Sequence, residues 1–308
     1  MKSNRIVVHL SGGLGNQLFQ FMAGVGLSEI TRKKLVINSN FYRNPWLRHR
    51  SHVAYSLKRR LEVYDFQTVA TTTRDRTKTP SDGRFERALR VLPESTKRRF
   101  GVASEESFID GEWVRPEEIS RLVGYFMSPE FFLNSTTTHR FQQLVNPPHS
   151  WVTQMSEKIS SEKSVGIHLR LGDYLLQNDI VVPKEIYFLN AIERFYDVLG
   201  TKIKTFLFTD EPKLLAQNFP TLAAHVELVT PPPEVSSAEN LKLLSKCSAF
   251  VCSNSTFSWW GAHLSNVSSS LIIHPSTFYT SNLAKLSHLR LWEPNSISIS
   301  PESGENVN

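Results

Sequence analysis

The amino-acid sequence predicts an α/β protein made of two Rossmann-like domains. The chain has 308 residues, more than a single hydrophobic core usually holds, so we expect two domains of roughly 150 residues each. Strand, turn and helix signals alternate along both halves, as they do in parallel α/β sheets. The composition, with 40% hydrophobic and 21% charged residues, is that of a folded globular protein.

The first domain, residues 1–150, opens with a βαβ pattern. Apolar residues 6–10 form a strand, a Gly-rich turn follows at 11–17, residues 18–31 have helical apolar spacing, and 35–38 form a second strand. The first apolar run is too short for a secretory signal or a membrane span, so we expect a cytoplasmic protein.

A basic insertion occupies about residues 43–100. Residues 43–99 contain 15 Lys and Arg against 6 Asp and Glu. A solvated surface explains such a block, and so does contact with nucleic acid, anionic lipid or a phosphorylated substrate. The block lacks the interleaved aromatic residues of a single-strand binder and has no helix-turn-helix or zinc-finger spacing, which argues against nucleic acid. Peripheral contact with the inner face of the membrane stays an open alternative.

The second domain begins after Pro147 and Pro148 and shows a cleaner alternation. It spans residues 151–290, and a C-terminal tail follows at 291–308. This pattern is typical of a nucleotide-binding Rossmann-like domain. We expect strands at residues 164–169, 204–209, 226–229, 249–253 and 270–274, and helices at 151–160, 183–199, 212–218, 237–246 and 256–264.

The sequence offers no metal site. Its two cysteines, Cys247 and Cys252, lie in an apolar stretch and cannot complete a zinc quartet, so we expect two buried thiols. An Asp-x-Asp motif, which would hold a divalent cation against a diphosphate, is absent from the sequence. We therefore predict no metal and no other cofactor.

The first polar motif is Ser11-Gly-Gly-Leu-Gly-Asn-Gln17, between the first strand and the first helix. Its glycines let the backbone approach a ligand at the positive end of a helix. A dinucleotide loop would have a third glycine in place of Leu18 and an acidic residue in place of Asn38, so an NAD-dependent oxidoreductase is a poor fit. A tight turn without a ligand would leave Asn16 and Gln17 unexplained.

The second motif, Val165-Gly-Ile-His-Leu-Arg-Leu-Gly-Asp-Tyr174, is a buried strand that ends in polar residues. His168 and Arg170 point to the same face, because side chains alternate along a strand. At the C-terminal end of a strand in an open α/β sheet, that face borders the ligand crevice. Arg170 offers a planar fork of donors to a diphosphate, and Asp173 can orient it or accept a proton. A structural Arg–Asp pair is the alternative interpretation.

Two further motifs follow the ends of later strands. In Phe206-Leu-Phe-Thr-Asp-Glu-Pro212, Asp210 either caps the next helix or accepts the two-donor edge of guanine. In Ser253-Asn-Ser-Thr-Phe-Ser-Trp-Trp-Gly261, hydroxyl groups and free backbone N–H groups at a helix start make a phosphate or ribose cradle. We expect Trp259 and Trp260 to pack in the core.

These four motifs, in this order, resemble those of glycosyltransferase family 11, the α-1,2-fucosyltransferases. A fifth segment, Gly124-Tyr-Phe-Met-Ser128, resembles the family's Gly-Tyr-aromatic-x-Ser sequence. The resemblance runs from residue 10 to about residue 275. The family usually has a second arginine at the position where this chain has Leu171.

The resemblance implies a GT-B-like fold, in which two Rossmann-like domains face each other across a cleft and the N-terminal domain lies on the acceptor side. It implies GDP-fucose as donor, a galactose-containing oligosaccharide or lipid-linked glycan as acceptor, and a cytoplasmic enzyme without a metal. Arg170 would bind the β-phosphate, Asn16 would lie near the transferred sugar, and Asp210 near guanine. The other donor-binding residues that it implies are Gly13, Gly15, Gln17, His168, Tyr174, Ser253, Asn254, Ser255, Thr256, Phe257 and Ser258.

The predicted reaction is a single inverting displacement at the anomeric carbon, which needs no covalent nucleophile. Arg170 and helix-start amides neutralise the leaving β-phosphate in place of a metal. Asp173 is the candidate general base, and late proton transfer to a phosphate oxygen is the alternative. Two other functions fit the sequence: a transferase of the same fold that uses another nucleotide sugar or acceptor hydroxyl, and a basic non-catalytic protein that binds nucleic acid or a membrane.

Overall fold

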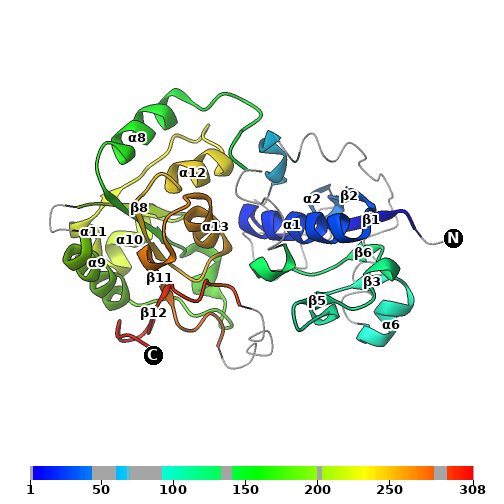
Figure 1. Cartoon of the computed structure of the whole chain (residues 1–308). Coiled ribbons are helices and arrows are strands. Elements are labelled where there is room, and N and C mark those ends of the chain that lie inside the picture. The colour runs from blue at the N-terminus through cyan, green and yellow to red at the C-terminus, as the bar shows by residue number, and fades with distance from the viewer. Residues whose placement is uncertain are drawn as a thin grey trace. The chain divides into compact units, whose positions relative to one another are not determined.

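The structure is a computed structural model that describes residues 3–43, 60–67, 69, 92–132, 141–199, 203–280 and 290–307. Most of the basic insertion predicted at about 43–100 lies outside these residues. The chain divides into two compact units. The first contains Met1–Val145 and Leu289–Leu291, and the second contains Asn146–His288 and Trp292–Asn308. Each unit is built on a parallel sheet with helices, which confirms the predicted α/β class (Figure 1). The cleft between the domains stays a prediction.

The first unit has a four-stranded parallel sheet in the order β2-β1-β6-β3. Helix α1 (Leu14–Thr31) connects β1 to β2, and the side chains of Phe19, Phe21 and Met22 on it are fully buried. The helix begins four residues before its predicted start at residue 18, because Leu14 is already buried and Gly13 takes the N-cap position. The strands are β1 (Arg5–His9), β2 (Lys34–Asn38), β3 (Val102–Ala103) and β6 (Arg121–Leu122).

The other described elements of this unit are short. They are α2 (Asn40–Arg43), α6 (Glu94–Arg99), the antiparallel pair β4 (Phe108–Ile109) and β5 (Glu112–Trp113), and 3-10 turns at Val63–Asp65, Glu105–Ser107, Pro116–Glu118 and Pro129–Phe131. An aromatic cluster of Phe108, Trp113, Phe126 and Phe131 packs around the antiparallel pair.

The second unit has a six-stranded parallel sheet in the order β12-β11-β10-β7-β8-β9. Its strands are β7 (Ser164–Leu169), β8 (Lys204–Thr209), β9 (Glu227–Leu228), β10 (Ala249–Cys252), β11 (Ile272–Pro275) and β12 (Ile297–Ile299). Numbered from β7 and followed from β9 to β12, the strands have the order 3-2-1-4-5-6 of the Rossmann fold. Residues 291–308 were expected as a tail, but β12 lies in this segment and pairs with β11, so the segment completes the sheet.

Helices cover both faces of this second sheet. Apolar side chains alternate along the strands: Leu207 packs into the cluster formed with α9 and α11, whereas Phe206 and Phe208 pack into the cluster formed with α8, α12 and α13. The helices are α8 (Ser150–Ser160), α9 (Glu185–Leu199), α10 (Pro212–Asn218), α11 (Pro220–His225), α12 (Ser237–Leu244) and α13 (Thr256–Leu264), with 3-10 turns at Gly172–Leu176 and Ser269–Leu271. Within the described ranges, no helix combines the length and the hydropathy that a membrane span requires.

The core of the second unit contains the residues that the sequence assigned to it. Trp259 and Trp260 are buried, as predicted. Cys247 and Cys252 are buried free thiols, also as predicted, and burial raises the pKa of Cys247 to about 12. Both cysteines therefore act as small apolar groups at neutral pH.

Candidate functional site

The strand order of the second sheet reverses between β7 and β10, and open α/β sheets bind ligands at the carboxyl ends of strands at such a point. The register pairs His168 of β7 with Cys252 of β10, and Leu169 with Thr209 of β8. The polar residues that follow all three strands therefore meet at one edge of the sheet.

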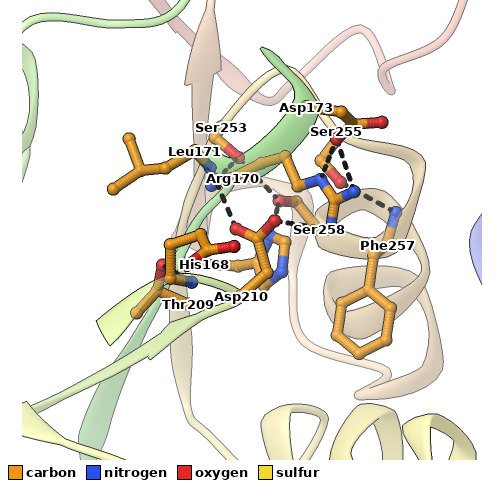
Figure 2. Close-up of polar contacts among 11 residues, drawn as sticks. His168, Arg170, Leu171, Asp173, Thr209, Asp210, Ser253, Ser255, Phe257 and Ser258 are labelled. Carbon is orange, nitrogen blue, oxygen red and sulfur yellow. Dashed lines mark hydrogen bonds and ion pairs between the residues drawn. The ribbon is translucent and has the colours of Figure 1, made fainter. Parts of the chain in front are cut away.

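Arg170 follows β7 directly and is held by two carboxylates (Figure 2). Its Nε and Nη2 atoms donate to Oδ1 of Asp173 at 3.1 and 2.5 Å, and its Nη1 atom forms an ion pair with Oδ2 of Asp210 at 2.9 Å. The guanidinium carbon also lies 5.6 Å from the ring centroid of Tyr174. Burial acts to lower the pKa of Arg170, but the charges of Asp210 and Asp173 outweigh it and raise the pKa. The site thus contains a fixed, mostly buried cation.

Backbone hydrogen bonds fix the ends of the three strands to one another. The Arg170 N–H donates to Oγ of Ser253 at 3.3 Å, and the Leu171 N–H donates to Oδ1 of Asp210 at 3.0 Å. The Ser253 N–H donates to the His168 carbonyl at 3.2 Å. The Arg170 side chain faces the polar cluster formed by His168, Asp173, Asp210, Ser253 and Ser258. The Leu171 side chain, in contrast, is fully buried in the core.

His168 is a buried, neutral member of the same cluster. Its Nδ1 atom lies 2.7 Å from Oγ of Ser258, and its ring stacks on Phe257 at a centroid distance of 4.8 Å. Burial, with a smaller contribution from the charge of Arg170, lowers the pKa of His168 to about 3. At neutral pH this side chain is therefore a hydrogen-bonding group and not an acid.

The start of α13 brings hydroxyl groups next to Arg170. Ser255 is the N-cap, and its Oγ atom accepts the Phe257 N–H at 3.3 Å. The hydroxyls of Ser253 and Ser258 lie 3.3 Å apart, and Thr256 opens the helix. The first turn of the helix carries no acidic side chain. A helix start of this kind suits an anion, because its N–H groups and dipole favour negative charge.

Asn254 lies within the same motif but holds loops together. Its Nδ2 atom donates to the carbonyls of Val181 and Thr277 at 2.7 and 2.8 Å, and the residue is almost fully buried. The two loops also pair directly, since the Val181 N–H donates to the Phe278 carbonyl at 3.1 Å. The predicted contact of Asn254 with the donor stays a prediction, whereas its role in shaping the loops is observed.

Asp210 does not cap the helix that follows it, so the capping alternative is wrong. The N-cap of α10 is Glu211, which makes no side-chain capping bond. The Asp210 carboxylate instead accepts from the Leu171 backbone and pairs with Arg170. A contact with guanine stays a prediction. The Arg170–Asp173 pair, which the sequence left open as a structural alternative, is present in the structure.

The residues of the first motif belong to the other unit. Gly13 and Gly15 lie at the start of α1, Asn16 is half-buried, and Gln17 is fully buried. The Gln17 side chain holds the segment at 60–63: Nε2 donates to the Arg60 carbonyl at 2.8 Å, and Oε1 accepts the N–H groups of residues 62 and 63 at 2.9 and 3.0 Å. This gives Gln17 a structural role, and the donor contacts of all four residues stay predictions.

Three supporting residues were missed by the sequence analysis. Tyr187 donates its hydroxyl to the Cys252 carbonyl at 2.7 Å, beneath the end of β10. Gln20 links the first motif to Gly124, since its Nε2 atom donates to Oγ of Ser11 at 3.1 Å and to the Gly124 carbonyl at 3.0 Å. Glu105 accepts the backbone N–H groups of residues 125 and 126. Of these three, Gln20 had a signal in the sequence: it is a polar residue between Phe19 and Phe21 in an apolar helix, which indicates a buried hydrogen-bond network.

Within the described ranges, no three His, Cys, Asp or Glu side chains gather in a way that would hold a metal ion. Metal independence itself stays a prediction.

Comparison with known proteins agrees with the motifs. The model of glycosyl transferase family 11 matches residues 124–294. The O-antigen biosynthesis glycosyltransferase WbnK of Escherichia coli is 25% identical over 299 residues, which cover 89% of this chain and 94% of that protein. The alpha-1,2-colitosyltransferase of Escherichia coli is 23% identical over 282 residues, with 89% and 92% covered. Among solved structures, the fucosyltransferase NodZ from Bradyrhizobium is similar with a TM-score of 0.48 and 16% identity, covering 86% of this chain and 94% of that chain.

Proposed function

This chain belongs to glycosyl transferase family 11, and we propose that it is an inverting fucosyltransferase that moves L-fucose from GDP-β-L-fucose to the 2-hydroxyl of a galactoside. The observation that carries this proposal is the position of Arg170. It is a buried cation at the switch point of a Rossmann-order sheet, held between Asp173 and Asp210 beside the hydroxyl-rich start of α13. A nucleoside diphosphate is the ligand class that this edge of such a sheet suits.

In the proposed reaction, Arg170 stabilises the negative charge that grows on the leaving β-phosphate. Asp173 takes Nε and one N–H of Nη2, and Asp210 takes one N–H of Nη1, so the second hydrogens of Nη1 and Nη2 are the donors that we assign to the phosphate. Because its carboxylate partners orient the fork before the donor arrives, little reorganisation is needed as the glycosidic bond breaks. A cation fixed in this way performs the role that a divalent metal has in other transferases.

The acceptor hydroxyl must lose a proton during the displacement. Asp173 is the candidate general base, and its Oδ1 atom also accepts two hydrogen bonds from Arg170. Proton transfer to a phosphate oxygen late in the reaction is the alternative. In either case Asp173 also orients Arg170.

A second candidate differs only in the sugar that is transferred. The similarity to the alpha-1,2-colitosyltransferase favours it. Colitose lacks the 3-hydroxyl of fucose, so the two donors share the nucleotide and differ at a single sugar position. The contacts around Arg170 serve both donors equally.

The test is a mass-spectrometric transfer assay with GDP-fucose and GDP-colitose against lactose and N-acetyllactosamine, with the linkage determined by NMR. We expect a fucosylated product with a new bond at the galactose 2-hydroxyl. A product from GDP-colitose alone would replace fucose with colitose, and a bond at another hydroxyl would remove the α-1,2 assignment. Binding that follows salt concentration and ignores GDP would instead indicate a non-catalytic basic protein.

A further inference from the structure

Both oxygens of the Asp210 carboxylate have partners that belong to the Arg170 strand end. Oδ1 accepts the Leu171 backbone N–H at 3.0 Å, and Oδ2 lies 2.9 Å from Nη1 of Arg170. The carboxylate thus contacts the residues that follow β7 at two places, the Leu171 backbone and the Arg170 side chain. Asp210 lies at the end of β8, the strand next to β7, so the contact joins two neighbouring strand ends.

Asp210 and Asp173 bind different nitrogen atoms of the same guanidinium. Asp173 takes Nε and Nη2, and Asp210 takes Nη1. Asp173 lies three residues beyond Arg170 on the same segment and would move with it, whereas Asp210 anchors the fork to a separate strand. Asp173 alone contacts two nitrogen atoms but belongs to the same segment as Arg170, so the contact with Asp210 is the one that ties the guanidinium plane to β8.

A guanine-reading carboxylate would have to offer both oxygens to the N1–H and 2-amino groups of the base. Asp210 has its oxygens directed to Leu171 and Arg170, and its side chain is only 21% exposed. We infer that Asp210 is a positioning residue that fixes the Arg170 fork for the donor diphosphate and that it does not read the guanine base. This inference rests on the proposed function, because it assigns Arg170 to the diphosphate.

The experiment compares GDP with inosine diphosphate, which differs only by lacking the 2-amino group of the base. Calorimetric affinities for both nucleotides, and kcat and KM for GDP-fucose, are measured for the wild type and for Asp210→Asn. This variant keeps the shape and an acceptor for the Leu171 N–H but removes the charge that faces Arg170. Asp197→Asn, at an exposed position on α9, is the matched control.

If Asp210 positions Arg170, the variant loses roughly 10-fold or more in kcat, because the fork is no longer held for the transition state. Its affinities for GDP and inosine diphosphate shift by the same factor, so their ratio keeps the wild-type value. If Asp210→Asn instead lost the preference of the wild type for GDP over inosine diphosphate, the inference would be overturned and Asp210 would be assigned to guanine recognition. An unchanged ratio together with an unchanged kcat would overturn it as well.

A double-mutant cycle separates positioning from a general loss of structure. In an Arg170→Lys background, Asp210→Asn should cost little more in kcat, since the fork that it holds is already gone. Two full, additive losses would contradict the inference. If Asp210→Asn does not fold, as judged by its melting temperature, Asp210→Glu takes its place. Its longer side chain displaces the carboxylate, so the affinities for GDP and inosine diphosphate should again change by the same factor. A wild-type enzyme that transfers no fucose would refute the proposed function, while the nucleotide ratio would still test Asp210.

Discussion

Acidification below about pH 6.5 should destabilise the second unit through three buried histidines. Burial lowers the pKa of His168 to about 3, with a contribution from the charge of Arg170, and burial lowers the pKa values of His263 and His274 to about 4. His263 stacks on Trp259 at a centroid distance of 4.4 Å, and His274 stacks on Trp292 at 4.8 Å. The folded protein therefore keeps all three rings neutral down to about pH 4.

The size of the effect follows from proton linkage. In the unfolded chain these histidines have pKa values near 6.5, so below that pH the unfolded state binds more protons than the folded state. Their contribution to the free energy of unfolding is complete above pH 6.5 and is lost as the pH falls toward 4. Each group costs about 1.4 kcal/mol per pH unit, and three cost about 4 kcal/mol per unit. Since domains are stable by about 5–15 kcal/mol, we expect unfolding near pH 5.

The assay is urea unfolding followed by circular dichroism between pH 8 and pH 4 at constant salt. His263→Phe should keep the stacking on Trp259 and reduce the slope of stability against pH by about a third, because one of three proton-binding groups is gone. His225→Gln, at an exposed position on α11, is the control and should leave the slope unchanged. A flat free energy of unfolding between pH 7 and pH 5 would refute the assignment of three neutral buried rings.

Three further predictions concern the metal, the arginine and one glycine. Fucose transfer should survive excess EDTA, and loss of turnover that manganese restores would contradict the role given to Arg170. Arg170→Lys should lower kcat by about 10²-fold with a smaller change in KM, and Arg170→Ala should be worse; a folded Arg170→Ala enzyme with normal kcat would exclude the assignment. Gly261→Ala should cost about 1–3 kcal/mol in urea unfolding, because the new Cβ would lie 2.4 Å from Cδ2 of Leu244. In a Leu244→Ala background, which opens this space, the same change should cost much less.

The sequence predicted the bounds of β7, β8, α10 and α13 to the residue, because each combines a strong periodic pattern with a clear polar or proline boundary. It placed the start of α1 too late, since three glycines suggested a long turn, whereas Leu14 is already helical and buried. The strand β12 was not predicted at all. Its three residues alternate apolar and polar, but the run is too short to distinguish a strand from a loop, and its pairing with β11 supplies the hydrogen bonds that define it.

The meeting of the second-unit motifs at one sheet edge was predictable from parallel-strand geometry alone. The partners of each side chain were not, because they depend on register and on loops that have no sequence signature. The spacing of Arg170 and Asp173 favoured their contact, but the ion pair with Asp210 needs β7 and β8 as neighbours in a fixed register. The loops that Asn254 joins come from two distant segments, so the motif alone favoured a ligand.

The departure from the family pattern at Leu171 can be interpreted through strand alternation. Arg170 directs its guanidinium toward the carboxylates, so the next side chain points to the opposite face, where Leu171 is fully buried among the apolar residues of β7 and α9. The contribution of residue 171 to the polar cluster is its backbone N–H, which any residue except proline can donate to Asp210. The leucine therefore leaves the geometry of Arg170 intact. It also leaves one cation between two carboxylates, so in the proposed reaction the orientation of Arg170 decides how the diphosphate is held.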